Sequence, residues 1–293
     1  MRSEKEMMNL IVGIAERDER IRAVYMNGSR TNPNIEKDIF QDYDVVYVVK
    51  ETRSFVDDKN WITLFGEILI MQLPDDNDNA WGANHDFSRS YAWLMLFRDG
   101  NRIDLSIETI EKARESFAKD YDKLTIVLLD KDNILPKCLP PSDEDYWVKK
   151  PTEEQYRAQC NEFWWCLNNV AKGIARDELP YAMWMYNVIV RESLEKMIEW
   201  HIGINTGFSL SAGKQGKFFR KYMPVELYEM YKRTYSSGEY DDFRKAIFTA
   251  CELFRIMARQ VAKHFGFTYN ENEDKSMTEY LIWVNNQQSI NSH

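Results

Sequence analysis

The chain has 293 residues, of which 44% are hydrophobic and 29% are charged, a composition typical of folded globular proteins. Its formal net charge of −9 argues against nucleic acid and anionic lipid as partners, because binding to either depends on Lys and Arg that neutralise phosphates. The same acidity either serves solubility or draws cations toward a cleft.

The cysteines and the apolar runs bear on the compartment. The four cysteines show no Cys-x-x-Cys spacing, which argues against a zinc site and a disulfide scaffold and favours a reducing compartment. The first ten residues are charged and lack the apolar stretch of a signal peptide, and no run approaches the roughly 18 apolar residues of a membrane span. We therefore predict a cytoplasmic protein without membrane association.

Helical and strand patterns alternate in the first half of the chain. Apolar residues at helical spacing predict a helix over 3–17. Runs rich in β-branched and apolar residues predict strands, in chain order at 21–26, 44–49, 68–73, 91–97 and 103–107. A last apolar run at 124–129 fits either a strand or a buried helix. We predict an α+β fold whose N-terminal domain, over 1–136, has a mixed β-sheet with helices.

The pattern changes in the second half. Four prolines between residues 136 and 151 punctuate a polar stretch, which we interpret as a linker over 137–149. Apolar residues then keep steps of three and four over 156–174, 186–201 and 243–261. This spacing predicts an all-α helical-bundle domain over 150–293. The last roughly twenty residues are polar, and we expect them to be loosely held.

Three aspartates carry the strongest chemical signal. Asp42 and Asp44 flank one residue at the start of a predicted strand, so alternation puts both carboxylates on one face, about 7 Å apart. At that distance they repel unless a cation lies between them, and carboxylate oxygens suit Mg²⁺. Asp104 lies within another apolar run. If the two strands are neighbours, the three carboxylates form a metal site, with Asp104 also placed to take a proton from an attacking hydroxyl.

A glycine-serine pair precedes these acids by twelve residues. Gly28 allows close approach of the backbone to a ligand, and the Ser29 hydroxyl can hold phosphate oxygens. Arg30 adds a guanidinium that can stabilise a departing pyrophosphate. Each feature alone has an ordinary explanation: Asp-x-Asp is common on solvated loops, Gly-Ser-Arg is more often a turn, and a lone strand Asp can be an edge charge. Their order and spacing together indicate a catalytic site.

That order resembles the signature of the nucleotidyltransferase superfamily, in which Gly-Gly or Gly-Ser precedes Asp-x-Asp or Asp-x-Glu and a third acid lies between apolar residues. More narrowly, the chain resembles the aminoglycoside 6-adenylyltransferases, which inactivate streptomycin. The similarity runs from near residue 1 to about residue 270 and is carried by segments at 22–32 (RAVYMNGSRTN), 40–44 (FQDYD), 128–132 (LLDKD), 146–152 (YWVKKPT), 160–165 (CNEFWW) and 207–214 (GFSLSAGK).

The resemblance implies a nucleotidyltransferase N-terminal domain and a helical C-terminal domain that closes the cleft. It also implies ATP and Mg²⁺ as cosubstrate and metal, and transfer of AMP to an aminoglycoside hydroxyl with release of pyrophosphate. Streptomycin is the leading acceptor, and antibiotic resistance is the expected effect. The three aspartates then match the metal-binding and catalytic acids, and Ser29 matches the phosphate-loop serine. Lys214 and Lys217 would reach the triphosphate from the helical domain, or are ordinary surface lysines.

Two departures from the family pattern bear on the acceptor pocket rather than on the ATP and metal residues. Trp184-Met185 stands where the family usually has Asp-His, and the 74–90 loop, whose acids form a lip over the cleft or are simply loop, differs from the family's Pro-rich version. A polycationic sugar favours carboxylates and aromatic faces. The candidate acceptor-binding residues, each of which also has an ordinary surface or packing explanation, are Glu162, Trp165, Asp177 and Glu178.

Other functions stay open. One is a nucleotidyltransferase that acts on a different small molecule or on a protein side chain. Another is a catalytically silent nucleotide-binding module, although the presence of all three acids weighs against it. An enzyme that extends RNA is disfavoured by the net charge of −9 and by the lack of a basic face.

Overall fold

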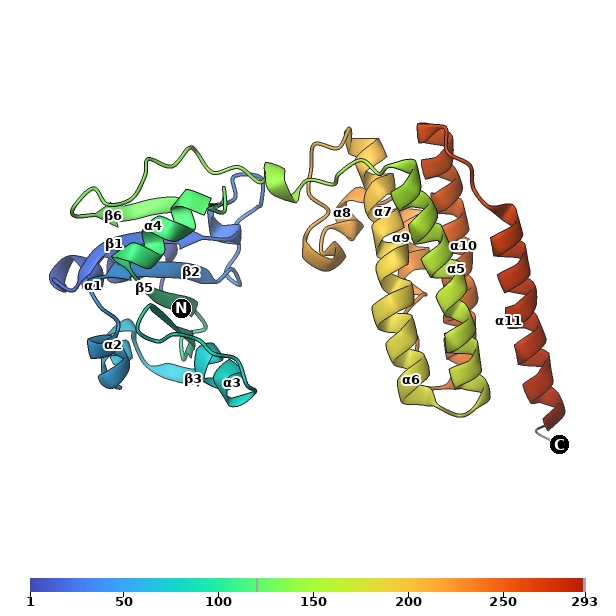
Figure 1. Cartoon of the computed structure of the whole chain (residues 1–293), viewed down its shortest axis with the longest axis horizontal. Helices are drawn as coiled ribbons and strands as arrows, with labels where there is room; N and C mark the ends of the chain where they lie inside the picture. Colours follow the sequence, from blue (N-terminus) through green and yellow to red (C-terminus); the bar gives the residue numbers. More distant parts are fainter. Residues whose placement is uncertain (120, 292–293) are drawn as a thin grey trace. The chain divides into compact units, whose positions relative to one another are not determined.

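A computed structural model describes residues 1–119 and 121–291 (Figure 1). The chain divides into two compact units, Met1–Asp145 and Tyr146–His293. The first holds a mixed six-stranded β-sheet with helices, and the second is helical, so the α+β class predicted from the sequence is confirmed. The expected linker over 137–149 spans the division between the two units.

The sheet of the first unit has the strand order β3-β4-β5-β2-β1-β6. Its strands are β1 (Ile21–Asn27), β2 (Tyr43–Val49), β3 (Ile68–Gln72), β4 (Ser90–Phe97), β5 (Arg102–Thr109) and β6 (Ile126–Asp130). β2 and β5 pair in parallel, whereas the other neighbours are antiparallel. Each strand lies within about two residues of its predicted range, and the ambiguous run at 124–129 contributes the strand β6.

The main core of this unit lies on one face of the sheet. Helix α1 (Glu4–Arg17) begins at a capping box made by Ser3 and Glu6, which satisfies backbone donors of its first turn. Its buried stripe, which includes Met7 and Ile11, packs on alternate apolar side chains of the central strands. Short helical segments complete this core: α2 (Arg53–Asp57) and the 3₁₀ turn η2 (Trp61–Phe65).

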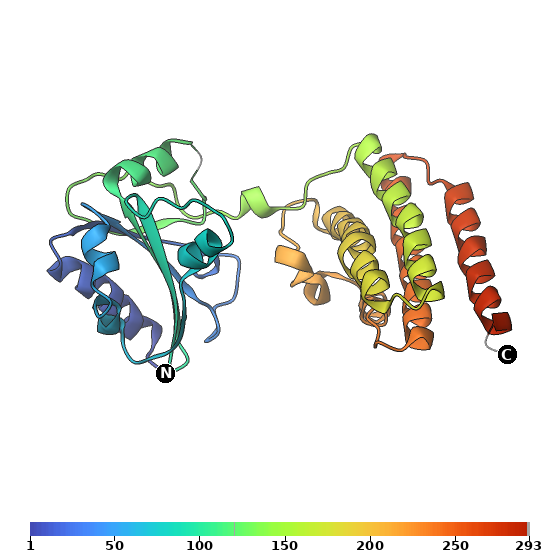
Figure 2. The ribbon, with the colours of Figure 1, turned by 60° about the horizontal axis from the view of Figure 1, so that its bottom comes forward.

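The opposite face of the sheet is covered only in part. Helix α4 (Ile110–Lys119) packs Ala113 there against Ala23, Tyr25 and Val48. Figure 2 shows α4 and α1 on opposite sides of the sheet. The helix α3 (Pro74–Ala80) lies in the 74–90 segment, next to β4. The uncovered part of this face carries the predicted acids.

The second unit is a helical bundle with a tightly packed aromatic core. The stacked rings of Phe163 and Phe254 lie 3.8 Å apart between centroids, and Cys160, Cys166 and Cys251 are buried as free thiols in the same core. The three predicted stripes fall on its long helices. Its elements are α5 (Glu153–Ala175), α6 (Leu179–Trp184), a π-helical turn (Met185–Val190), α7 (Arg191–Thr206), α8 (Phe219–Tyr222), α9 (Val225–Lys232), α10 (Tyr240–Phe265) and α11 (Glu271–Asn291).

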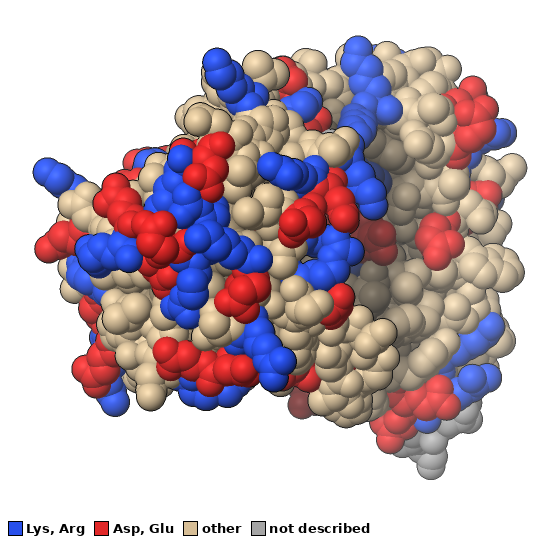
Figure 3. Space-filling view, turned by 60° about the vertical axis from the view of Figure 1, so that its left-hand side comes forward, with Lys and Arg blue, Asp and Glu red and all other residues tan. Residues whose placement is uncertain are grey.

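The surface mixes charges of both signs. On the face drawn in Figure 3, Lys and Arg side chains alternate with Asp and Glu side chains rather than gathering into one basic region. Ion pairs between the two signs include Arg22–Asp132, at 2.5 Å, and Arg98–Glu67, at 2.6 Å. Within the described residues, no helix combines the length and the apolar character that crossing a membrane requires.

The C-terminal segment differs from its prediction. Helix α11 begins at Glu271 and packs against α5, with Leu281 and Val284 buried. The expectation of a loosely held end is therefore wrong for the described residues up to 287, while 292 and 293 lie outside them. A polar sequence misled the prediction because much of the docking is polar.

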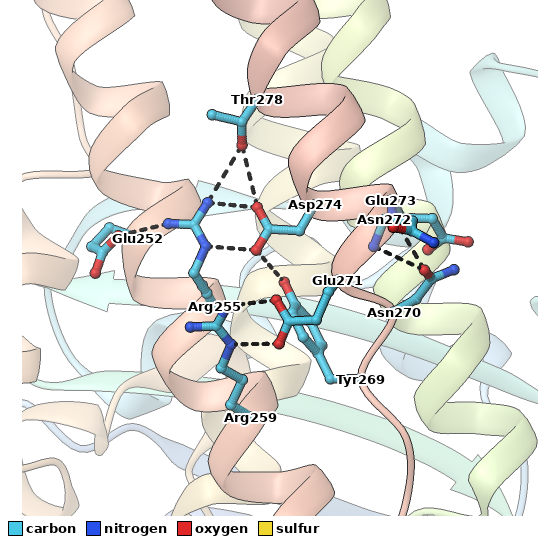
Figure 4. A network of polar contacts seen from close by, with 10 residues as sticks. All are labelled: Glu252, Arg255, Arg259, Tyr269, Asn270, Glu271, Asn272, Glu273, Asp274 and Thr278. Carbon is cyan, nitrogen blue, oxygen red and sulfur yellow. Dashed lines mark hydrogen bonds and ion pairs between the residues drawn. The ribbon is translucent and has the colours of Figure 1, made fainter.

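Figure 4 shows the network that joins α10 to α11. The Arg255 guanidinium donates to both carboxylate oxygens of the buried Asp274, each at 2.6 Å. The Tyr269 hydroxyl donates to the same carboxylate at 2.9 Å, and Thr278 adds a longer bond. Burial opposes ionisation of Asp274, but the bonds from Arg255 and Tyr269 outweigh it and hold the pKa of this carboxyl below its usual value.

Asp274→Asn should therefore destabilise the helical unit by about 2–3 kcal/mol, because the partly buried guanidinium of Arg255 loses its bidentate bond to a buried carboxylate and keeps only Glu252 as a charged partner. Since the pKa of Asp274 is lower in the folded state, its contribution is present at neutral pH and is lost as the pH falls below about 4. Urea denaturation followed by circular dichroism measures both effects. Glu271→Gln is the matched control: its pair with Arg259 is half-exposed, so the change should cost under about 1 kcal/mol. Equal losses in the two variants would contradict the assignment.

Candidate catalytic site

The three predicted acids lie together at one edge of the uncovered sheet face. The parallel pairing of β2 and β5 sets Asp44 directly opposite Asp104. Asp42 immediately precedes β2, level with Arg102 at the start of β5. The strands of Asp44 and Asp104 are therefore neighbours, which was the condition for the three carboxylates to converge.

Electrostatic repulsion within this cluster is partly unrelieved. Burial, together with the nearby charges of Asp104 and Asp42, raises the pKa of Asp44 to about 6. Burial also raises the pKa of Asp42, although the Arg102 guanidinium opposes that rise. The cluster therefore favours an added cation, which would lower the free energy of the ionised carboxylates.

Arg102 is a residue that the sequence analysis missed. Its Nε and Nη2 donate to the two carboxylate oxygens of Asp104, each at 2.7 Å, and its Nη1 lies 3.4 Å from Asp42 Oδ2. The available signal was its position two residues before Asp104, which puts both side chains on one face of β5.

The donor chemistry fits a divalent cation, but the arrangement is not preformed. Among residues 1–119 and 121–291, no group of three His, Cys, Asp or Glu side chains is placed to hold a metal as it stands. Carboxylate oxygens are the ligands that Mg²⁺ prefers. A guanidinium already bound between two of the three acids shows that the cluster accepts a positive charge.

Gly28 makes room for the central acid. It follows β1, whose last residue pairs with Asp44, and it has a φ of +82°. A Cβ at this position would lie 2.2 Å from Asp44 Oδ2, which is far inside van der Waals contact. Ser29 comes next, half-buried at the start of a 3₁₀ turn, η1 (Ser29–Thr31), and its carbonyl accepts a hydrogen bond from the Gln41 side chain at 3.4 Å.

The structure gives Arg30 a different environment from the expected one. Its side chain is only 5% exposed, stacks 3.9 Å from the centroid of the Tyr43 ring, and donates to the carbonyls of Gln41 at 2.5 Å and Asp42 at 3.2 Å. These bonds mean that Arg30 fixes the backbone that carries Asp42. Its contact with a departing pyrophosphate stays a prediction.

The helical unit contributes a separate pocket of about 860 Å³. Lys214 is exposed at this pocket, which Trp147, Lys149, Lys196 and Trp200 also line. The Lys214 backbone belongs to a loop with left-handed residues on both sides, Gly213 at φ +77° and Gln215 at φ +53°. Glu199 also lines the pocket and pairs with Lys196 at 2.5 Å. The pocket therefore combines ammonium groups, one of them already paired, with tryptophan side chains, a chemistry suited to an anionic ligand with a planar ring.

Lys217 lies just beyond this loop, at the end of the 3₁₀ turn η5 (Lys214–Gly216), and is also exposed. Its ammonium group lies 5.3 Å from the centroid of the Phe218 ring. It is absent from the residues that line the pocket. The structure thus separates the surroundings of the two lysines that the sequence grouped together.

Comparison with known proteins identifies the family. The family model described as streptomycin adenylyltransferase matches residues 1–284. The chain belongs to this family.

Among its relatives are proteins named aminoglycoside 6-adenylyltransferase from Bacillus subtilis, Campylobacter jejuni and Staphylococcus aureus. They are 39%, 40% and 36% identical, each over 96% of this chain and over 97%, 96% and 98% of the relative. A crystal structure of an aminoglycoside 6-adenyltransferase from Bacillus subtilis is 34% identical, with 97% of this chain and 99% of that chain covered, at a TM-score of 0.47. The resemblance inferred from the sequence is confirmed.

The four candidate acceptor residues of this family member do not gather at one point. Glu162 and Trp165 are exposed on α5, and Trp165 lines an apolar groove of about 520 Å³ beside α11. Asp177 and Glu178 lie past the end of the same helix, about 18 Å from Trp165 at the rise of an α-helix. Asp177 accepts a hydrogen bond from the Tyr240 hydroxyl at 2.8 Å. The two pairs therefore cannot contact one small sugar ring together.

Gly28→Ala should destabilise the sheet unit by about 2–4 kcal/mol, because the new Cβ would clash with the Asp44 carboxylate and the backbone conformation favours glycine. A double-mutant cycle with Asp44→Ala tests the cause: removing the carboxylate should recover at least about 1 kcal/mol of the loss. Denaturation of the four proteins gives the coupling energy. Additive losses would show that backbone strain alone explains the cost. Gly266→Ala, with φ +75° and open space around it, reports that strain without a clash.

Proposed function

We propose that this protein transfers AMP from ATP to a hydroxyl of an aminoglycoside, with streptomycin as the acceptor to test first. The observation that carries the proposal is the pairing of Asp44 with Asp104 beside Gly28, in a chain that matches the streptomycin adenylyltransferase family over residues 1–284. Three relatives named aminoglycoside 6-adenylyltransferase, similar over nearly their full length, support the choice of acceptor class.

The proposed reaction forms a bond between the acceptor oxygen and the α-phosphorus and breaks the bond from that phosphorus to the bridging oxygen. Pyrophosphate leaves with the bond electrons, and the hydroxyl proton passes to a base. Asp104 is our choice for this base. Of the three acids it lies on the strand next to β4, and its side chain is 20% exposed and so accessible to an acceptor. Asp42 and Asp44, together with an oxygen of Asp104, would hold Mg²⁺, which when bound neutralises charge on the phosphates.

The residues around the acids have supporting roles. Ser29, at the start of its 3₁₀ turn, would donate its hydroxyl to a phosphate oxygen, with Gly28 allowing the backbone to approach. Arg30 would act as a positioning residue through the Gln41 and Asp42 carbonyls. A fixed backbone matters because small displacements of reacting groups can slow a reaction by about a hundredfold.

The lysine pocket of the helical unit is proposed to take the anionic part of the nucleotide. Lys214 is the preferred ligand because it lines the pocket, and Lys217 is the weaker candidate because it lies over Phe218. For the acceptor, Glu162 with Trp165 and Asp177 with Glu178 are alternative pairs rather than one site. Trp184, where the family usually has Asp, is 54% exposed, which leaves it accessible to a ligand.

Lys214→Ala should raise the KM for ATP by about tenfold and leave kcat within about twofold. The reason is that the lost charge-assisted bond to phosphate would stabilise bound ATP and the transition state equally. Steady-state kinetics with ATP varied measure this change. Lys263→Ala, on the exposed last turn of α10, controls for the loss of a surface charge. The same rise in both variants would point to long-range electrostatics instead of a contact.

The protein, ATP, Mg²⁺ and streptomycin should together yield streptomycin heavier by one AMP, with equimolar pyrophosphate. Mass spectrometry and a pyrophosphate assay follow the two products.

Asp44→Asn should lower the rate at least about a hundredfold without lowering the melting temperature, since it removes like-charge repulsion. Asp132→Asn, which removes a carboxylate that is 42% exposed and pairs with Arg22, should transfer AMP like the wild type. AMP transfer only to another aminoglycoside would change the acceptor, and neither product with any of them would favour the silent binding module.

A further inference from the structure

Arg102 bonds to the acids in a way that occupies the oxygens a metal would use. Its guanidinium takes both oxygens of Asp104, at 2.7 Å each, and extends to Asp42 at 3.4 Å. The pairing with Asp104 is bidentate, the strongest common geometry between arginine and a carboxylate. A cation that binds Asp104 through oxygen must therefore exchange with this side chain.

The surroundings of Arg102 allow such an exchange. Its side chain is 42% exposed, and the contacts described for its guanidinium go only to Asp104 and Asp42. The other arginine close to the acids, Arg30, is 5% exposed and held by two backbone carbonyls and the Tyr43 ring. One arginine is thus built into the protein, and the other can leave without disturbing the core.

We propose that Arg102 is an exchangeable counter-ion, a positioning residue that holds the acid cluster together before the metal binds and is displaced when it binds. The proposal rests on the metal site of the proposed function. Three carboxylates and one guanidinium carry a formal charge of −2, so Arg102 relieves only part of the repulsion, and a divalent cation relieves more. Replacement of Arg102 by a divalent cation is therefore favourable, although the arginine competes with the cation and weakens its binding.

This exchange also favours a metal–nucleotide complex over the free ion. A free ion displaces the guanidinium into water, where its bonds to Asp104 have no anionic replacement. A metal–nucleotide complex brings phosphate oxygens, which match the planar donors of arginine as well as a carboxylate does. Arg102 thus weakens the binding of free metal more than the binding of metal with nucleotide.

Titration of the full-length protein with Mn²⁺, followed by the electron paramagnetic resonance of the free ion, tests the proposal without turnover. In the absence of nucleotide, Arg102→Gln should bind Mn²⁺ on the order of tenfold more tightly than the wild type, because the competing cation is gone. Arg102→Lys keeps the charge and should stay closer to the wild type. Arg98→Gln is the matched control, because Arg98 directly follows β4, pairs with Glu67 and is 62% exposed.

Two further measurements, of the melting temperature and of Mn²⁺ affinity in the presence of nucleotide, test the same proposal. Without metal, Arg102→Gln should melt at a lower temperature than the wild type, and Mn²⁺ should raise its melting temperature by more. With a non-hydrolysable ATP analogue present, its tenfold advantage in Mn²⁺ affinity should shrink or reverse. A purely structural surface pair would lower the melting temperature but would leave the affinity for Mn²⁺ unchanged.

Equal or weaker Mn²⁺ binding by Arg102→Gln would overturn the proposal, and so would a failure of both proteins to bind Mn²⁺. Neither result would remove the proposed function, which depends on AMP transfer by the wild type. Conversely, tighter binding by Arg102→Gln in a protein that transfers no AMP would keep the counter-ion and reject the transferase.

Discussion

The register of the parallel β2–β5 ladder is the constraint on which the candidate catalytic site depends. It sets Asp44 opposite Asp104, and it follows from burial on the other face, where Ile103, Leu105 and Ile107 are fully enclosed. A shift of one residue would turn those three side chains to the uncovered face and send Asp104 into the core. The apolar packing under the sheet therefore determines where the carboxylates above it lie.

The elements of the fold could be predicted from local patterns, but the contacts between distant elements could not. Strand and helix positions follow apolar periodicity, which is a property of neighbouring residues. The docking of α11 depends instead on Arg255 reaching Asp274 from a different helix, with Tyr269 bonded to the same carboxylate. In a sequence, a buried aspartate cannot be told from a polar surface residue. Its role in holding the helix in place becomes visible only when the structure shows which side chain it pairs with.

The candidate site divides along the same line. Gly28 and the Asp42–Asp44 pair were recognisable because they form short sequence motifs. The position of Asp104 followed once its strand was assumed to lie next to the strand of Asp44. The two arginines were not recognisable in this way. Arg30 had the residue type for a phosphate contact, yet its environment commits it to the carbonyls of Gln41 and Asp42. Arg102 belonged to no motif: only its position two residues before Asp104 indicated their pairing, and its contact with Asp42 depends on the register of β2 and β5.

The two arginines together explain how a cluster of like charges persists in a stable sheet. Two ionised carboxylates about 5 Å apart repel by roughly 3 kcal/mol at an effective dielectric near 20, enough to matter in a marginally stable domain. Arg30 resists this repulsion through the backbone, where its bonds and its stacking on Tyr43 fix the approach to β2 from within the protein. Arg102 resists it through charge, from the solvent side, where it can be replaced. A buried cation in its place would hold the acids equally well but would block their use, so the exposure of Arg102 is what leaves the cluster able to exchange one cation for another.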